Sequence, residues 1–251
     1  DLVRSRGLGD VYKRQNLGIG DTVVTTNASL KWEKDAYAGQ RCFIIGTGAS
    51  IMAEDLRPLA DEFTMGCNGL FLWKGLPFTP TVYCMIDHPA FGMWHKQIEQ
   101  LDTYRVAGLR QLDTWPKEDI SNWHVIEQRR DMAVYDGYWN GYLPDFTWCA
   151  GRSNVVWSLS AQLAFWLGFG EVYMLGVDGG PRVHCYDYMD YLSGNKDIGS
   201  AIPGKGDLHI RKTVLESVKH FEDAGRKIIN LNPLSKTGWE PYNVTLKEVL
   251  K

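Results

Sequence analysis

The sequence predicts a single α/β domain with a mainly parallel sheet and helices on both faces. The chain of 251 residues is 44% hydrophobic and 23% charged, which is the balance of a globular protein. From Asn16 onward, short apolar runs of strand character alternate with amphipathic stretches, and no repeat, low-complexity tract or linker interrupts them. This alternation favours parallel strands joined by helices.

The N-terminal half contains three clear strands, at residues 42–45, 63–67 and 81–86. The first leads through a glycine-rich segment, residues 46–50, into a polar helix near 53–61. The other predicted elements of this half are an amphipathic helix at 91–101 and weaker strands at 104–108 and 123–127. Residues 131–149 are expected to form an irregular excursion near the ligand-binding site.

The C-terminal half shows clearer periodicity. Apolar residues at helical spacing predict a helix over 155–167, followed by a buried strand at 172–177. A second amphipathic helix begins near Leu208 and ends at Gly225, before a last strand at 227–231. Ligands of open parallel sheets bind beyond the carboxyl ends of the strands, so we expect the chemistry at that edge.

Composition excludes several classes of protein. No apolar run approaches the roughly 18 residues needed to cross a bilayer, which excludes an integral membrane segment. The net charge is −3 and the basic residues are scattered, so no nucleic-acid partner is expected. Five cysteines without C-x-x-C spacing indicate neither a disulfide framework nor a zinc site, and they favour a cytoplasmic location.

Residues 1–15 are expected to be an artefact. The six residues from Asp10 to Gln15 resemble a translated sequencing-transposon adapter, and the alternative is a polar N-terminal arm. Without this leader the net charge is −5, and the single domain spans residues 16–251.

The first candidates for ligand binding follow the strands of the N-terminal half. They are Gly46, Thr47, Gly48, Ala49 and Ser50 after the first strand, Asn68 after the second and Asp87 after the third. Backbone N–H groups and small side chains after a strand let a phosphate approach closely, although a tight turn is the alternative for the glycine segment. The segment lacks the third Gly of a dinucleotide fingerprint and the Gly-Lys-Ser/Thr end of a P-loop. Asn68 and Asp87 either contact the ligand or cap helices.

His209 is the candidate general base. Asp207 is a suitable N-cap, which places His209 in the first turn of the amphipathic helix. A helix N-terminus disfavours the imidazolium form, so the neutral ring could accept a proton. A surface histidine beside a cap is the alternative.

The loop after Asp178 carries further polar side chains. Tyr186 and its neighbouring tyrosines could donate hydrogen bonds to phosphate oxygens, whereas His184, Asp187 and Asp190 could hold a metal. No zinc-type spacing and no Asp-x-Asp pair at a strand end supports a metal, so none is expected. The absence of a G-x-S-x-G motif argues against a serine hydrolase, and Cys185 has no better support as a nucleophile.

Together these stretches resemble the domain of unknown function 115 superfamily, which includes 6-hydroxymethylpterin diphosphokinase MptE-like proteins. The similar stretches are residues 43–50, 65–68, 85–89, 161–169 and 171–178, and the resemblance extends over about residues 31–233. It implies transfer of diphosphate from ATP with Mg²⁺, for which Asp87, Asp178 and Asp187 are the candidate ligands.

The same layout resembles the bacterial sialyltransferases of glycosyltransferase family 42, which use a CMP-sugar without a metal. This resemblance places residues 46–50, Asn68 and Ser153 at the nucleotide, Tyr186 at the phosphate and His209 as the catalytic base. The chain departs from that pattern at Ala49, Asp87 and Gly180, where the sialyltransferases have Pro, Asn and Tyr.

We therefore expect a Rossmann-like, nucleotide-binding, metal-independent inverting glycosyltransferase with a CMP-sugar-like donor. His209 would deprotonate the acceptor, Tyr186 and the amides of residues 46–50 would stabilise the leaving phosphate, and Asp87 would orient the donor sugar. No cofactor is expected, and the acceptor would be a glycan or a small molecule. The alternatives are the Mg²⁺-dependent diphosphokinase and a non-catalytic nucleotide- or glycan-binding module. Peripheral membrane attachment and homo-oligomerisation stay open.

Overall fold

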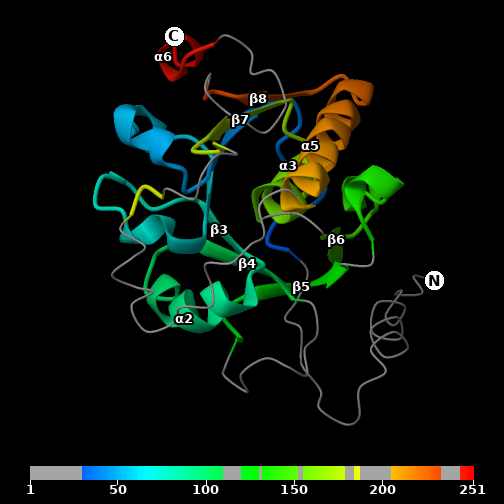
Figure 1. Ribbon diagram of the computed structural model, residues 1–251, viewed down its shortest axis with the longest axis horizontal. Coiled ribbons are helices and arrows are strands. Elements are labelled where there is room, and N and C mark those ends of the chain that lie inside the picture. The colour runs from blue at the N-terminus through cyan, green and yellow to red at the C-terminus, as the bar shows by residue number, and fades with distance from the viewer. Residues whose placement is uncertain are drawn as a thin grey trace, which may run out of the picture.

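One sheet of eight parallel strands organises the chain. The computed structural model describes residues 30–109, 120–129, 132–151, 155–178, 184–186, 205–232 and 244–251. Along the chain the strands are β1 Arg41–Ile45, β2 Thr64–Cys67, β3 Val82–Met85, β4 Tyr104–Leu109, β5 His124–Arg129, β6 Trp148–Ala150, β7 Glu171–Leu175 and β8 Lys227–Asn230. Their order in the sheet is β6-β5-β4-β3-β2-β1-β7-β8 (Figure 1).

Helices cover both faces of this sheet. The α-helices are α2 His88–Ile98, α3 Ala161–Trp166, α5 Lys205–Asp223 and α6 Leu246–Val249, and a π-helical turn, η7 Val156–Ser160, precedes α3. Helix α2 packs on one face, whereas α3 and α5 pack together on the other (Figure 1). The predicted fold class, an α/β domain with a parallel sheet between helices, is therefore confirmed.

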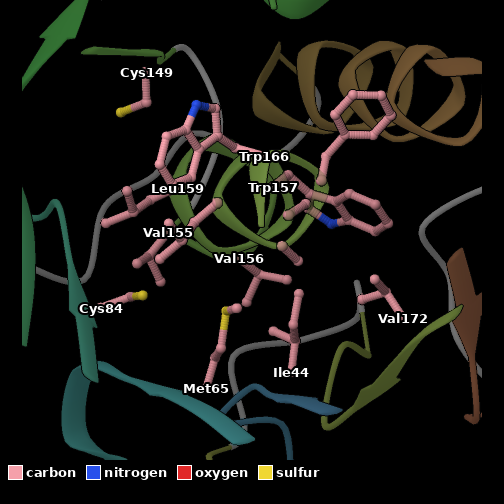
Figure 2. Packing of buried hydrophobic residues seen from close by; sticks show 14 of the residues in the cluster. Ile44, Met65, Cys84, Cys149, Val155, Val156, Trp157, Leu159, Trp166 and Val172 are labelled. Carbon is pink, nitrogen blue, oxygen red and sulfur yellow. The ribbon is translucent and has the colours of Figure 1, made fainter. Parts of the chain in front are cut away.

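Burial on both faces explains why the strand-forming runs are apolar throughout rather than alternating. In β1, Cys42 and Ile44 contact the layer of α3, while Phe43 and Ile45 contact the layer of α2. Figure 2 shows the α3 side, where Trp157 and its neighbours lie over Ile44 and Met65. All five cysteines are buried as free thiols.

The polar helix expected near residues 53–61 is absent. Two short 3₁₀ turns, η1 Ala49–Ala53 and η2 Arg57–Leu59, occupy this stretch instead. Between them the Asp55 carboxylate accepts the backbone N–H of Arg57 at 3.1 Å and also binds its guanidinium group. This local hydrogen bond competes with helix formation, and Pro58 removes a further backbone donor.

Of the irregular excursion predicted at residues 131–149, the structure describes residues 132–149. They form two 3₁₀ turns, η5 Val134–Asp136 and η6 Asn140–Tyr142, and then β6, which was not expected. Trp139 stacks on His220 in the last turn of α5, which leads toward the start of β8. Lys34, shortly before β1, donates to the carbonyl of Tyr142 at 3.1 Å. These contacts place residues 139–142 toward the amino edge of the sheet, whereas Met132 accepts the N–H of Gly151, just after β6, at 3.2 Å and so lies at the carboxyl edge.

Most other boundaries agree with the sequence to within a few residues. Helix α2 begins three residues before the predicted stretch, and both weaker strand candidates form β4 and β5. Strand β7 ends at Leu175 because Gly176 adopts a left-handed conformation with φ of 63°. Helix α6 was not expected, and Thr245 and Glu248 close its first turn with a capping box. No helix within the described ranges is long and apolar enough to span a membrane.

A buried and an exposed leucine on neighbouring helices allow the contribution of core packing to stability to be tested. Leu163 in α3 is fully buried, whereas Leu215 in α5 is 48% exposed. We expect Leu163→Ala to lower the free energy of unfolding by about 2–5 kcal/mol, because it leaves a cavity beneath the sheet. Leu215→Ala should change the same quantity by less than about 0.5 kcal/mol. Urea denaturation of the two variants tests this, and equal losses would contradict the assignment of the core.

Candidate functional site

The candidate site lies at the carboxyl edge of the sheet, where β1 and β7 are neighbours. From β1 the chain continues to β2 on one side, whereas from β7 it continues to β8 on the other. The connections therefore diverge between β1 and β7, and such a switch point is where open α/β sheets bind ligands. The predicted glycine segment, residues 46–50, begins at this point.

The glycine segment interlocks with the end of β7. Gly46 donates its N–H to Leu175 at 2.8 Å, and Gly48 donates to Gly176 at 2.8 Å. A Cβ atom on Gly46 would lie 2.5 Å from the Gly176 oxygen, and one on Gly48 would lie 2.5 Å from the Asp178 carboxylate. Both glycines are thus required by the close approach of two strand ends. Their amides are engaged within the protein, which favours the turn interpretation at these two positions.

Asp178 joins three segments at this edge. Its carboxylate accepts the backbone N–H of Ser50 at 3.1 Å, the Ser50 hydroxyl at 2.5 Å and the Asn232 side-chain amide at 2.8 Å. Asn232 follows β8, and its own N–H donates to the side chain of Asn230 at 3.1 Å. Asn232 is not among the site residues that the sequence predicts. These hydrogen bonds give Asp178 a structural task that differs from the metal-ligand role considered for it.

Residues 184–186 return to the glycine segment from the loop after β7. Gly48 and His184 form an antiparallel bridge, and Cys185 donates its N–H to the carbonyl of Thr47 at 2.9 Å. His184 Nδ1 lies 3.0 Å from the Thr47 hydroxyl. Burial raises the pKa of the Cys185 thiol to about 12, so the thiol stays protonated at neutral pH and is a poor nucleophile.

Asn68 places a buried polar side-chain atom at the end of β2. It opens the 3₁₀ turn η3 Asn68–Leu72 with a left-handed φ of 48°, a conformation that few residues other than Gly and Asn adopt. Its carbonyl accepts the Tyr83 hydroxyl at 2.8 Å, and burial raises the pKa of that phenol. The side-chain oxygen of Asn68 is buried, and among the described residues it has no hydrogen-bond partner. An unsatisfied buried acceptor costs about 1–3 kcal/mol, so Asn68 is suited to a ligand that donates to it.

Tyr186 reaches the same place as Asn68. Its ring is almost completely buried, and a Cβ atom on Gly69 would lie only 2.7 Å from the Tyr186 hydroxyl oxygen. The phenol end therefore lies over Gly69, the residue that follows Asn68. The structure thus brings together three features that the sequence singled out: the glycine segment, Asn68 and Tyr186.

The other predicted site residues are placed only in part. Asp87 occupies the N-cap position of α2, but its exposed side chain does not make the capping hydrogen bond. His209 lies in α5, which begins at Lys205, two residues before the predicted cap Asp207; the His209 side chain lies outside the described part of the structure. Ser153, Asp187 and Asp190 also lie outside the described residues. Within the described ranges, no group of three or more His, Cys, Asp or Glu side chains could hold a metal ion.

Comparison with known proteins finds similarity of fold. No protein-family profile matches the chain, and no curated protein matches it by sequence. The chain is similar in structure to the monofunctional α-2,3-sialyltransferase Cst-I from Campylobacter jejuni, with a TM-score of 0.54, 13% identity, and coverage of 87% of this chain and 85% of that one.

A second sialyltransferase is similar to the same degree. The chain matches CstII from Campylobacter jejuni in complex with the substrate analogue CMP-3FNeuAc, with a TM-score of 0.51, 16% identity, and coverage of 78% and 83%. A CST-II variant in complex with CMP gives a TM-score of 0.53 at 16% identity, covering 80% and 86%. At these identities the likeness establishes a shared fold. The resemblance to the domain of unknown function 115 superfamily stays an expectation.

A pair of glycine variants tests the interlocking of the two strand ends. Gly176 and Gly225 both have left-handed φ, but a Cβ atom at 176 would lie 2.6 Å from Ile51 and one at 225 would meet nothing within 4 Å. We expect Gly225→Ala to lower the free energy of unfolding by about 1–2 kcal/mol through backbone strain alone. Gly176→Ala should cost a further 1–3 kcal/mol or so from steric overlap. Thermal and urea unfolding measure both, and similar values for the two variants would show that the contact is relaxed.

Proposed function

We propose that the protein is a glycosyltransferase whose donor is a nucleotide-activated sugar similar to a CMP-sugar. The proposal rests on one observation: Asn68, Tyr186 and the glycine segment lie close together at the switch point of the sheet. Support also comes from the shared fold with sialyltransferases whose structures contain CMP or CMP-3FNeuAc.

In the proposed reaction the sugar is transferred with inversion and without a metal. His209 removes the proton from an acceptor hydroxyl as that oxygen attacks the anomeric carbon of the donor. The bond between the anomeric carbon and the phosphate oxygen breaks, and the nucleotide leaves with the bonding electron pair. Tyr186 stabilises the negative charge on the departing phosphate by donating its hydroxyl hydrogen. Asp87 orients the donor sugar from the N-terminus of α2.

The hydrogen bonds at the edge of the sheet limit which groups could bind the phosphate of the donor. Gly46 and Gly48 already donate their amides to Leu175 and Gly176 at the end of β7, and Ser50 donates its amide to Asp178. We therefore assign the phosphate to side-chain donors, chiefly Tyr186, rather than to those three amides. The buried oxygen of Asn68 suits a hydroxyl or amino group of the nucleoside. Ser153 remains a proposed nucleotide contact.

The remaining parts of the proposal follow from the sequence. The acceptor is a glycan or a small molecule, and the acidic net charge disfavours nucleic acid. A cytoplasmic location without a bound cofactor is proposed from the cysteine pattern and from the resemblance to metal-independent transferases. These features set the conditions for the assay: reducing buffer, with and without Mg²⁺.

Ligand-induced stabilisation identifies the nucleotide. We expect CMP at about a hundredfold excess over its Kd to raise the Tm by about 5–10 °C without Mg²⁺, because a ligand stabilises the folded state that binds it. The panel contains CMP, CDP, UDP, GDP and ATP, each with and without Mg²⁺. Stabilisation by ATP with Mg²⁺ alone would replace this proposal with the diphosphokinase. Binding of CMP without CMP release from any CMP-sugar would indicate a non-catalytic module.

The role of His209 is tested by comparison with a second histidine of the same helix. His209→Ala should lower the rate of CMP release from a CMP-sugar by about 10²–10⁴-fold, because the acceptor loses its general base, while the affinity for CMP is kept. His220→Ala, in the last turn of α5 and at the other edge of the sheet, should leave the rate per folded molecule within about twofold. Full transfer by His209→Ala would exclude the mechanism.

A further inference from the structure

We propose that His184 is a positioning residue that holds Tyr186 at the candidate phosphate site and ties it to Thr47. The inference rests on the proposed function for the reaction in which Tyr186 acts. His184 was considered in the sequence only as a candidate metal ligand, whereas its contacts assign it a different task.

The imidazole of His184 touches both partners. Its ring stacks on the ring of Tyr186, with centroids 5.2 Å apart and an interplanar angle of 13°. Its Nδ1 atom lies 3.0 Å from the Thr47 hydroxyl. One side chain therefore links the glycine segment to the phenol, and the hydrogen bond fixes the rotation of the ring on which Tyr186 rests.

The described neighbours of Tyr186 contact its ring in different ways. The hydroxyl end of the phenol lies over Gly69, where a Cβ atom would come within 2.4 Å of Cζ. Trp94 of α2 meets the ring edge-on at 6.0 Å and 87°. Among the described residues, His184 is the one that the phenol stacks on in parallel. Loss of the imidazole would open a gap along the face of the phenol and let it tilt.

Backbone contacts keep the segment attached when the His184 side chain is changed. The bridge between Gly48 and His184 and the hydrogen bond from Cys185 N–H to Thr47 at 2.9 Å do not involve that side chain. Substitutions at 184 should therefore alter the orientation of Tyr186 without releasing residues 184–186 from the glycine segment. This separation makes the role testable with a folded protein.

Three substitutions separate the two contacts of the imidazole. His184→Phe keeps the stacked ring and loses the Nδ1 contact, His184→Asn keeps a polar atom near Thr47 and loses the ring, and His184→Ala loses both. We expect kcat for CMP-sugar turnover to fall about 100-fold in His184→Ala, since a displacement of about 1 Å costs that much. His184→Phe should stay within about tenfold of the wild type, the value of one hydrogen bond, and Thr47→Val should match it. The KM for the donor should change less than kcat throughout.

A double variant distinguishes positioning from a general structural effect. If His184 acts through the phenol hydroxyl, His184→Ala should lower kcat little further in a Tyr186→Phe background. Losses that multiply in the double variant would overturn the proposal, as would a His184→Phe variant as slow as His184→Ala.

An activity-independent measurement separates this proposal from the proposed function. With 3-fluorotyrosine at position 186, ¹⁹F NMR should show sharp lines in the wild-type chain and in His184→Phe, and broadened or additional lines in His184→Ala; a change of chemical shift alone does not count, because loss of the imidazole ring current shifts the resonance by itself. Lines as sharp and as few in His184→Ala as in the wild-type chain would refute the positioning role whatever the enzyme does. Broadened or additional lines in a protein that neither binds CMP nor turns over a CMP-sugar would refute the proposed function and retain the positioning role.

Discussion

The carboxylate of Asp178 holds together the segments from which the candidate site is built. By accepting hydrogen bonds from Ser50 and Asn232, one side chain joins the ends of β1, β7 and β8. The strand ends approach so closely that Gly46 and Gly48 cannot carry side chains. The glycine segment is therefore shaped first by the packing of the sheet itself. Asn68 and Tyr186 lie next to this packed edge, where residues 184–186 pair with the glycine segment.

The sheet could be predicted from the sequence because parallel strands are buried on both faces and leave continuous apolar runs. Even the weaker runs that became β4 and β5 were recognisable. Residues 53–61 were misjudged because the hydrogen bond between Asp55 and Arg57 overrides the tendency of that stretch to form a helix. Strand β6 has three residues, too few for a periodic pattern, and its pairing with β5 determines it.

The sequence could predict those residues of the candidate site whose position follows from the direction of the parallel strands alone. Asn68 and Asp178 follow strands, and parallel strands bring their carboxyl ends to one edge. The sequence left two interpretations of the glycine segment, a phosphate-binding loop and a tight turn. A bound phosphate and a neighbouring strand end both approach the backbone closely and therefore both require glycine. The contact between His184 and Thr47 joins residues 137 positions apart. No local pattern encodes which part of a long loop returns to the sheet, so this contact required the structure.

The position of β1 between β2 and β7 has a consequence for synthesis on the ribosome. Strands β1 to β6 are neighbours in the order in which they are made, so each can pair as it emerges. The other edge of β1 waits for β7, since Arg41 pairs with Glu171, 130 residues later. At about 5–20 residues per second, translation of that interval takes roughly 7–26 s. Throughout it the nascent chain exposes an apolar strand edge, and the glycine segment takes its final shape only when β7 arrives.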